Sequence, residues 1–397
     1  MEKTPYYAIV TETFPPEING VALTVRNLCE GLRQQGLRVE LVRPRQKDDP
    51  AQLVDTLLVP GLALPRYPGL QFGLPARQRL LRQWRQQPPA ALYVATEGPL
   101  GWSAVSVARK LGIPVATGLH TRFDEYMRDY GLPWLEPLAF RWMRHFHNRA
   151  ANTVVPTEEL AQWLRQRGFN RVSRLARAVN AQRFSPARRD PALRQQWGVT
   201  EQQLVVTYMG RIAAEKNLPL AVQAFRAIQA QHPNARFVWI GDGPARASLE
   251  NANPDFIFTG MQLGDELARH LASTDLFLFP SKSETFGNVT VEALASGVPT
   301  VAFDYGAARE HLRHDQFGYT VSSDADFIAA ALRLASHPQR PEMGKAAHQA
   351  MTALRPQQVA ERFLALLVST GKPTSDAPIR HSTRPGSGAT APLSRKP

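Results

Sequence analysis

The stretch that decides the fold spans residues 277–310, FLFPSKSETFGNVTVEALASGVPTVAFDYGAARE. Apolar runs at 276–279 and 300–303 predict two buried strands, and the segment between Asn288 and the Gly-Val-Pro turn predicts a helix that connects them. A strand, a helix and a second strand in this order form the repeating unit of a parallel α/β sheet. The segment therefore predicts an α/β fold.

Two glutamates, Glu284 and Glu292, flank the start of the predicted helix. In an α/β layout both face the crevice at the carboxyl ends of the strands, where such sheets bind ligands. The backbone amides of Phe286, Gly287 and Asn288 lie at the helix N-terminus, where free N–H groups and the helix dipole favour an anion. A phosphate at a helix start, beside a carboxylate that holds hydroxyl groups, is the chemistry of a nucleotide-sugar site.

A second motif, YMGRIAAEKNLPLAVQAF at 208–225, supports this interpretation. A short apolar strand at 204–209 is followed by a loop and then by an amphipathic helix. Arg211 and Lys216 lie on that loop, again at the carboxyl end of a strand. An arginine fork and a mobile lysine charge suit a diphosphate leaving group without a metal ion. Two ordinary solvated cations are the alternative, and the Gly-Arg and Lys-Asn context favours phosphate binding.

Together these motifs resemble the donor-binding signature of the retaining glycosyltransferases of family 4. That family has the GT-B fold, in which two Rossmann-like parallel-sheet domains face each other across a cleft. The resemblance covers about residues 6–370 and implies that Arg211 and Lys216 hold the donor diphosphate. It further implies that Glu292 takes the ribose hydroxyls and that Glu284 contacts the transferred sugar. The substrate implied is a nucleotide-diphosphate sugar, GDP-mannose or a UDP-hexose, and the hexose is transferred with retention of configuration.

Four residues of the first half extend the implied site. The loop TETFPPEINGV ends in Gly20, where relatives place a glycine against the donor phosphate, although a plain Asn-Gly turn is an equally good interpretation of the residues alone. His120 matches the position that contacts the donor sugar. Asp124 and Tyr126, which we assign to the acceptor or sugar pocket, belong to an F-D-x-Y portion shared with a glycolipid-forming subgroup. That subgroup comprises sulfolipid-synthase-like diacylglycerol glycosyltransferases and GDP-mannose-dependent α-mannosyltransferases.

Two departures from the family pattern bear on the predicted site. Gly118-Leu119 replaces a polar-aromatic pair just before His120, in the lining of the sugar pocket. Residues 177–180, Arg-Ala-Val-Asn, stand where relatives carry R-G-V-D at the interdomain linker. The loss of the glycine and of the carboxylate concerns the hinge geometry and one donor contact.

The order of apolar runs predicts two domains in the 397 residues. We expect an N-terminal acceptor-binding domain at 1–178 and a C-terminal nucleotide-sugar domain at 179–355. The resemblance implies that a last helix at 356–370 crosses back onto the first domain. Residues 371–397 lack an apolar period and are predicted to be disordered.

Composition excludes several classes of protein. A single cysteine, Cys29, excludes a disulfide framework, and no apolar run reaches the 18 residues that would span a bilayer, so we expect a cytoplasmic protein. Residues 1–178 hold 24 Lys and Arg against 15 Asp and Glu, whereas residues 179–370 hold 18 of each. Nucleic acid and an anionic membrane surface are the two candidate partners for such a basic domain.

Two basic-aromatic segments, 75–87 and 137–150, lie in this basic half. Arginine next to tryptophan and phenylalanine on a helix is typical of docking at a lipid headgroup layer. The alternative is a helix whose aromatic side is core and whose arginines are solvated. Their shared location favours peripheral association with the inner face of the cell membrane.

Asp324-Ala325-Asp326 has the D-x-D spacing that holds a metal in another transferase fold. Because Ser322 and Ser323 precede a helix of alanines, this segment predicts a helix cap instead. We expect no metal ion and no other cofactor.

These observations favour a hexosyltransferase acting on a membrane lipid, with Glu284, His120, Arg211 and Lys216 as the catalytic residues. A soluble or lipopolysaccharide-type acceptor and a same-fold sugar-nucleotide epimerase are the alternatives. A nucleic-acid-binding protein would explain the charge, but it leaves the glutamates beside the phosphate-binding residues unexplained.

Overall fold

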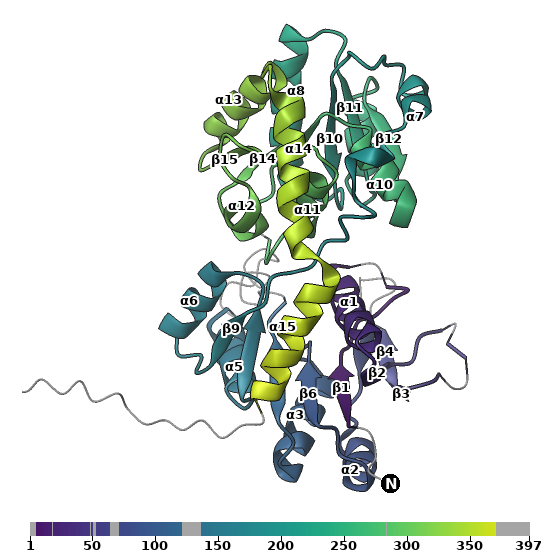
Figure 1. Cartoon of the computed structure of the whole chain (residues 1–397), viewed down its shortest axis with the longest axis vertical. Coiled ribbons are helices and arrows are strands. Elements are labelled where there is room, and N and C mark those ends of the chain that lie inside the picture. Colours follow the sequence, from purple (N-terminus) through teal and green to yellow (C-terminus); the bar gives the residue numbers. More distant parts are fainter. Residues whose placement is uncertain are drawn as a thin grey trace, which may run out of the picture.

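The structure is a computed structural model, and it describes residues 5–17, 19–47, 49–50, 53–63, 71–120, 136–282 and 284–370. Two lobes follow each other along the chain, each built around a parallel β-sheet (Figure 1). The α/β class and the pair of Rossmann-like sheets are as the sequence predicts.

Within the described residues, the first lobe holds a sheet with the strand order β3-β2-β1-β6-β7-β8-β9, and β4 pairs antiparallel with β5. Its strands are β1 (Tyr6–Val10), β2 (Arg38–Pro44), β3 (Thr56–Val59), β4 (Gly61–Ala63), β5 (Gln71–Gly73), β6 (Ala91–Val94), β7 (Val115–Gly118), β8 (Asn152–Val155) and β9 (Val172–Arg174). Its helices are α1 (Gly20–Gln34), α2 (Arg77–Gln86), α3 (Pro99–Leu111), α5 (Glu136–His147) and α6 (Glu158–Gln166).

The second lobe has a parallel sheet of order β12-β11-β10-β13-β14-β15. Its strands are β10 (Val205–Met209), β11 (Arg236–Ile240), β12 (Ile257–Gly260), β13 (Leu276–Phe279), β14 (Thr300–Phe303) and β15 (Gly318–Val321). Its helices include α7 (Pro191–Gln196), α8 (Leu218–Gln231), α9 (Arg246–Ala252), α10 (Gly264–Ala272), α11 (Asn288–Ala295), α12 (Gly306–His311), α13 (Asp324–Ala335) and α14 (Arg340–Met351). The 3-10 turns are η2 (Pro186–Arg188), η3 (Ala214–Lys216) and η4 (Thr352–Leu354).

The central strands are buried on both faces, as parallel sheets covered by helices require. In the second lobe one face packs against α8 and α13, around Tyr208, Trp239 and Phe327. The other face packs against α10, α11 and α14, around Phe277 and Leu294. Apolar side chains point to both sides of each strand, which explains the continuous rather than alternating apolar runs in the sequence.

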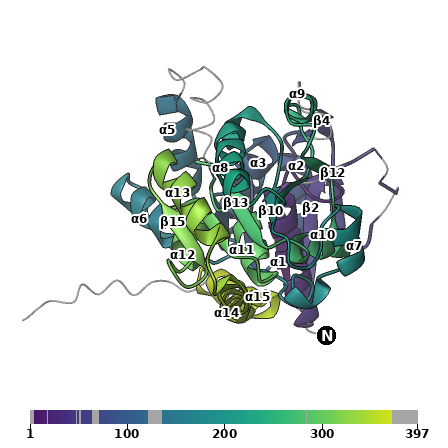
Figure 2. The ribbon, with the colours of Figure 1, turned by 90° about the horizontal axis from the view of Figure 1, so that it is seen from above.

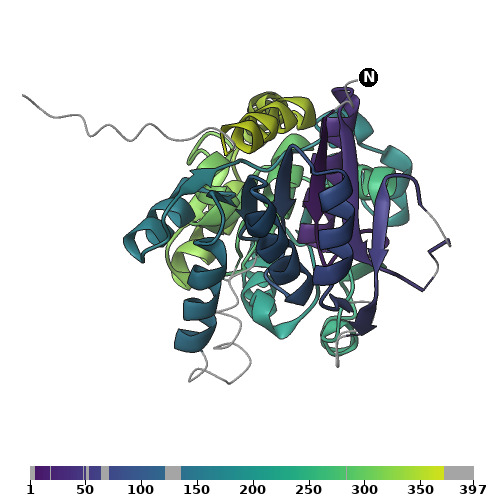
Figure 3. The ribbon, with the colours of Figure 1, turned by 90° about the horizontal axis from the view of Figure 1, so that it is seen from below.

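The last helix, α15 (Pro356–Ser369), packs on the first lobe although it follows the second in the chain. Figure 1 shows α14 and α15 end to end, with α14 on one lobe and α15 on the other; Figure 3 shows α15 along the outside of the first lobe. Phe363 and Leu367 lie fully buried in the same core as Ile9 and Tyr93. The first lobe therefore takes part of its core from the end of the described chain.

The lobes also meet through α12 and α6, which lie side by side (Figures 1 and 2). The Glu310 carboxylate accepts the Glu158 amide proton at 2.8 Å and pairs with Arg174 at 2.5 Å. Arg309 pairs with Glu159. These contacts fix the position of α12 relative to the first lobe. Because α12 also contacts the loop before α11, they help to position that loop as well.

Candidate active site

The residues predicted to bind phosphate follow β10 and β13, neighbouring strands of the second sheet. The strand order changes direction at this pair, and open α/β sheets bind ligands at such a point, beyond the carboxyl ends of the strands. Arg211 and Lys216 follow β10, and Glu284 follows β13. The topology alone therefore gathers three predicted residues at one sheet edge.

The loop that carries Arg211 is held against the loop that follows β11. Gly241 has a φ of 139°, and a Cβ at this position would lie 2.0 Å from the Gly210 carbonyl oxygen. Only glycine permits this approach of the two backbones. The Arg211 side chain itself is half exposed and lies 3.5 Å from the Glu215 carboxylate. Its guanidinium is therefore held by a long, solvent-exposed ion pair.

Lys216 and Glu284 meet directly across the two loops. The Lys216 Nζ lies 2.5 Å from Glu284 Oε1, and both side chains are about one-fifth exposed. The Ser281 hydroxyl donates to the same carboxylate oxygen at 3.1 Å. A cation and a carboxylate so close together can serve a phosphate and a sugar hydroxyl that are bonded to each other.

The start of α11 is shaped by the loop before it. Phe286 is buried, and the Ala307 amide donates to its carbonyl at 2.6 Å. Gly287 has a φ of 85°, in the left-handed region that glycine adopts without strain. Among the described residues, no acceptor receives the amide protons of Phe286, Gly287 or Asn288. The helix therefore presents unpaired donors to the crevice, as an anion site requires.

Glu292 lies one turn further along α11 and is largely buried. Burial raises its pKa to about 7. Within the part of the chain that the structure describes, its carboxylate has no hydrogen-bond partner and no ion pair. A carboxylate that is desolvated and unpaired has both oxygens available for a pair of hydroxyls.

The first lobe contributes Gly20, which begins α1. The preceding Asn19 caps this helix by accepting two amide protons at 3.1 and 2.8 Å, so a plain structural turn is also present here. A Cβ at position 20 would lie 3.4 Å from Asn288 Nδ2 and 3.5 Å from Arg177 Nη1. Gly20 thus faces the start of α11 across the two lobes, and glycine leaves room between them.

His120 lies just beyond the carboxyl end of β7 in the first sheet. Its Nε2 lies 2.8 Å from the Tyr93 hydroxyl. Burial, reinforced by the charge of Arg177, lowers the pKa of His120 to about 3. The imidazole is therefore neutral at physiological pH, so it can contact a sugar hydroxyl but supplies no positive charge. Asp124 and Tyr126 lie outside the described residues.

Arg177 is a residue of this site that sequence reasoning missed. It lies between β9 and the second lobe, and its Nη1 donates to Asn288 Oδ1 at 3.2 Å. Its Cζ lies 5.3 Å from the centre of the Phe286 ring. The signal in the sequence is its place in the Arg-Ala-Val-Asn segment, whose departures from the family pattern concern the hinge and one donor contact but not the arginine itself.

The departures in that hinge leave the backbone unstrained. Ala178 does not have a positive φ, so the glycine of relatives is not required at this position. Asn180 replaces the aspartate and accepts the amide protons of Gln182 and Arg183 at 3.1 and 3.0 Å. An asparagine oxygen performs this turn-forming role as an aspartate would.

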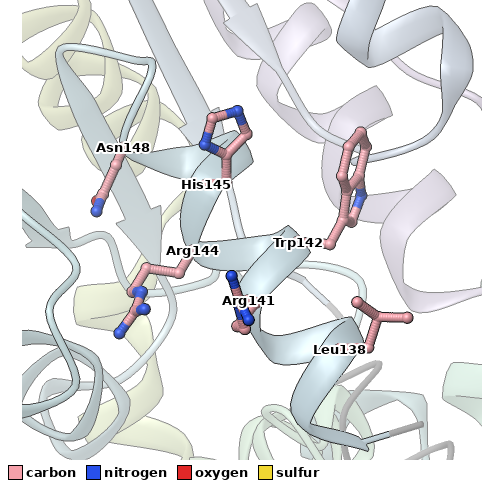
Figure 4. A pocket seen from close by; sticks show the side chains of 6 residues that line it. All are labelled: Leu138, Arg141, Trp142, Arg144, His145 and Asn148. Carbon is pink, nitrogen blue, oxygen red and sulfur yellow. The ribbon is translucent and has the colours of Figure 1, made fainter.

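The two basic-aromatic segments differ in the structure. In α2, Trp84 is buried and donates to Glu40 at 3.3 Å. The alternative interpretation, a helix whose aromatic side is core and whose arginines are solvated, therefore applies to α2. In α5, Leu138 and Trp142 are 64% and 44% exposed. Residues of α5 and the position after it line a hollow of about 530 Å³: Leu138, Arg141, Trp142, Arg144, His145 and Asn148 (Figure 4). Of the two segments, α5 alone keeps the exposed apolar and basic side chains expected at a lipid surface. Among the helices that the structure describes, none has the length and apolar character of a membrane span.

The D-x-D segment forms the helix cap that the sequence predicts. The Ser323 hydroxyl accepts the Asp326 amide proton at 3.1 Å at the start of α13. Asp324 pairs with Lys282 at 2.5 Å. Both aspartates thus have structural partners.

Comparison with known proteins agrees with this geometry. The sequence model described as "Glycosyltransferase Family 4" matches residues 18–183, and that described as "Glycosyl transferases group 1" matches residues 203–337. The chain is 35% identical to a GDP-mannose-dependent alpha-mannosyltransferase of Mycobacterium tuberculosis, over 76% of this chain and 80% of the relative. It is 27% identical to the alpha-monoglucosyldiacylglycerol synthase of Acholeplasma laidlawii, over 74% of this chain and 79% of the relative.

A solved structure, HepE of Anabaena in complex with UDP, superposes with a TM-score of 0.72 at 16% identity, covering 92% of this chain and 100% of that one. At that identity the likeness concerns the fold alone. The fold is GT-B, the arrangement of two Rossmann-like domains that the sequence resemblance implies. The strand order, the residues at the switch point and the matched sequences agree: the chain is a hexosyltransferase and belongs to the family 4 glycosyltransferases of GT-B fold.

Proposed function

We propose that the protein transfers a hexose from a nucleoside diphosphate sugar to a membrane lipid, with retention of configuration. The observation that carries this proposal is the contact between Lys216 and Glu284, beside the unpaired amides at the start of α11. A cation and helix-start donors suit a diphosphate, and the adjoining carboxylate suits the hydroxyls of the sugar attached to it. GDP-mannose is the preferred donor, because the mycobacterial relative is named for its dependence on it.

Each predicted site residue that the structure describes then has a role in the donor complex. The diphosphate lies at the start of α11, where Arg211 and Lys216 offset the charge that develops as the bond to the sugar breaks. Glu292 accepts the ribose hydroxyls, and Glu284 accepts hydroxyls of the transferred hexose. His120 is neutral and contacts the same sugar. In the mechanism implied for retaining members of the family, the acceptor attacks on the face that the leaving group departs from, and the departing phosphate takes its proton.

The acceptor proposal is supported by α5 and by one relative. The Acholeplasma enzyme is named for a product built on diacylglycerol, a membrane lipid. The α5 hollow combines Arg141 and Arg144 with the exposed side chains of Leu138 and Trp142 (Figure 4). Basic and apolar groups on one helix face suit the boundary between headgroups and acyl chains. We therefore place the protein peripherally on an anionic membrane surface.

Transfer of radiolabelled sugar tests this function. Purified protein is incubated with labelled GDP-mannose, UDP-glucose or UDP-galactose and with vesicles containing diacylglycerol or phosphatidylinositol, and label in the chloroform-soluble fraction is counted. Label should enter lipid from one donor only, and NMR of the product should show the anomeric configuration of the donor.

The variants Arg211→Ala and Glu284→Gln serve as matched negative controls, each expected to lose roughly tenfold to a thousandfold in turnover. Lipid labelling that is equal in both variants and the wild type would contradict the site. Transfer only to water-soluble acceptors, with lipids unlabelled, would favour the alternative of a soluble or lipopolysaccharide-type acceptor.

A further inference from the structure

Three arginines are buried among the described residues, and they are not equivalent. Arg43 is held by both oxygens of Asp49, at 2.7 and 2.6 Å. Arg194 pairs with Asp275 at 3.1 Å and donates to several carbonyl groups. These two show how the fold compensates the cost of a buried guanidinium, which is a carboxylate partner in each case.

Arg177 is buried to a similar extent, 8% exposed, but has no carboxylate partner among the described residues. Its hydrogen bond goes to the neutral amide of Asn288, and its Nε is buried without any partner. Burial lowers its pKa to about 10, which still leaves the guanidinium charged at physiological pH. A positive charge is therefore held between the lobes without an ion-pair partner among the described residues, and the Glu284 carboxylate offsets it only from beyond contact distance.

The surroundings of Arg177 indicate where that compensation comes from. Its guanidinium lies over the ring of Phe286, beside Gly20 and against the first residue of α11. By contrast, Lys216 is already paired with Glu284 at 2.5 Å. Arg177 thus lies next to the unpaired helix-start amides and, unlike Lys216, forms no ion pair with a carboxylate among the described residues. An anion at the start of α11 would satisfy both sets of donors at once.

We propose that Arg177 is a phosphate-binding residue that reaches the ligand from the segment connecting the two lobes. The inference rests on the proposed nucleotide-sugar site and adds to it a cation from outside the Gly-Arg and Lys-Asn motif. The phosphate belongs to the donor diphosphate, or else to an anionic lipid acceptor that approaches the same point from the first lobe. Because Arg177 also holds Asn288, it couples phosphate binding to the position of α11 relative to Gly20.

The test measures binding of GDP and of guanosine by calorimetry to the full-length protein and to three variants. Arg177→Gln should weaken GDP binding roughly tenfold to a hundredfold, which is what loss of a charge-assisted hydrogen bond gives, and should change guanosine binding less than about twofold. Arg177→Lys should fall between, because it keeps the charge without the fork that reaches Asn288. Arg183→Gln is the matched control: this arginine lies on the same segment, is 41% exposed and pairs with Asp265. UDP and uridine are used in the same way if the wild type prefers them.

The outcomes separate the two phosphate sources and a merely structural role. Unchanged GDP binding in Arg177→Gln with a raised KM for a phospholipid acceptor assigns the phosphate to the acceptor. Unchanged GDP binding and unchanged acceptor KM would overturn the proposal, as would an equal loss of GDP and guanosine binding with a lowered melting temperature. Failure of the proposed function is distinguishable, because the wild type itself would then bind neither GDP nor UDP.

Discussion

The Glu292→Gln variant is predicted to be more stable than the wild type at alkaline pH, and the advantage should shrink as the pH falls. Burial raises the pKa of Glu292 from 4.5 to about 7, so the folded state binds this proton more tightly than the unfolded state. For a carboxyl group with a raised pKa, the favourable contribution is present at low pH and is lost as the pH rises from 4.5 through 7. Above pH 7 the folded protein carries a desolvated charge that glutamine does not have.

The size of the effect follows from the change in pKa. At about 1.36 kcal/mol per pKa unit the change corresponds to about 3 kcal/mol, and solvent screening of a side chain that is not fully enclosed reduces it to about 2 kcal/mol. For a domain of this size that is a difference in melting temperature of roughly 4–8 °C. By pH 5 about three quarters of the difference should have disappeared, because the folded wild type is then protonated at Glu292.

Differential scanning calorimetry without ligand, at pH 8.5 and at pH 5, measures this difference. Glu361→Gln is the matched control, since Glu361 is an exposed helical glutamate on α15 and its replacement removes no buried carboxylate. A difference between Glu292→Gln and the wild type that is equal at both pH values would refute the reasoning. So would a variant less stable than the wild type at pH 8.5. The same substitution should raise the donor KM, because the ionised carboxylate is the group proposed to accept the ribose hydroxyls.

Three further predictions concern the charges of the site and of the surface. Lys216→Ala should lower kcat roughly tenfold to a thousandfold, since it removes a charge opposite the leaving diphosphate; an unchanged kcat in single-turnover assays would contradict this role. Activity should survive EDTA, because cationic side chains and helix-start amides do the work of a divalent ion; a loss restored by Mg²⁺ or Mn²⁺ would overturn that expectation. The protein should sediment with anionic liposomes at low salt and be released as salt rises. Replacing Arg141 and Arg144 of α5 by Gln should weaken this binding by about 2 kcal/mol, roughly thirtyfold, whereas the same change at the exposed Arg79 and Arg82 of α2 should have a smaller effect.

The sequence was sufficient for the elements that carry the proposed donor site. The strands at 276–279 and 300–303 and the helix that begins at Asn288 lie where the apolar runs and the Gly-Val-Pro turn predict them. The sequence predicted that Lys216 and Glu284 each follow the carboxyl end of a strand, and the adjacency of β10 and β13 in the sheet brings the two side chains into contact. Such inferences succeed because local pattern and sheet order together determine them.

Tertiary burial was the part that the sequence did not reveal. The α2 and α5 segments have the same arginine and tryptophan pattern, yet Trp84 is core and Trp142 is exposed, because only the neighbouring elements decide which face is covered. Arg177 lies in a segment without strand or helix periodicity. Its burial arises from the approach of the two lobes, which no pattern in its own segment records.

The passage of α15 back onto the first lobe has a consequence for synthesis of the chain. Gly31 of α1 lies so close to α15 that a Cβ there would approach the Ala360 Cβ to 2.5 Å, so the two helices fit only as a matched pair. At the ribosome, the residues of the first lobe are complete well before α15 is made, by roughly ten to forty seconds at ordinary elongation rates. During that interval the apolar side chains of the first lobe that share a core with Phe363 and Leu367 lack the cover that α15 provides. A ribosome-bound nascent chain that ends before residue 356 therefore has an N-terminal lobe without the helix that completes its core.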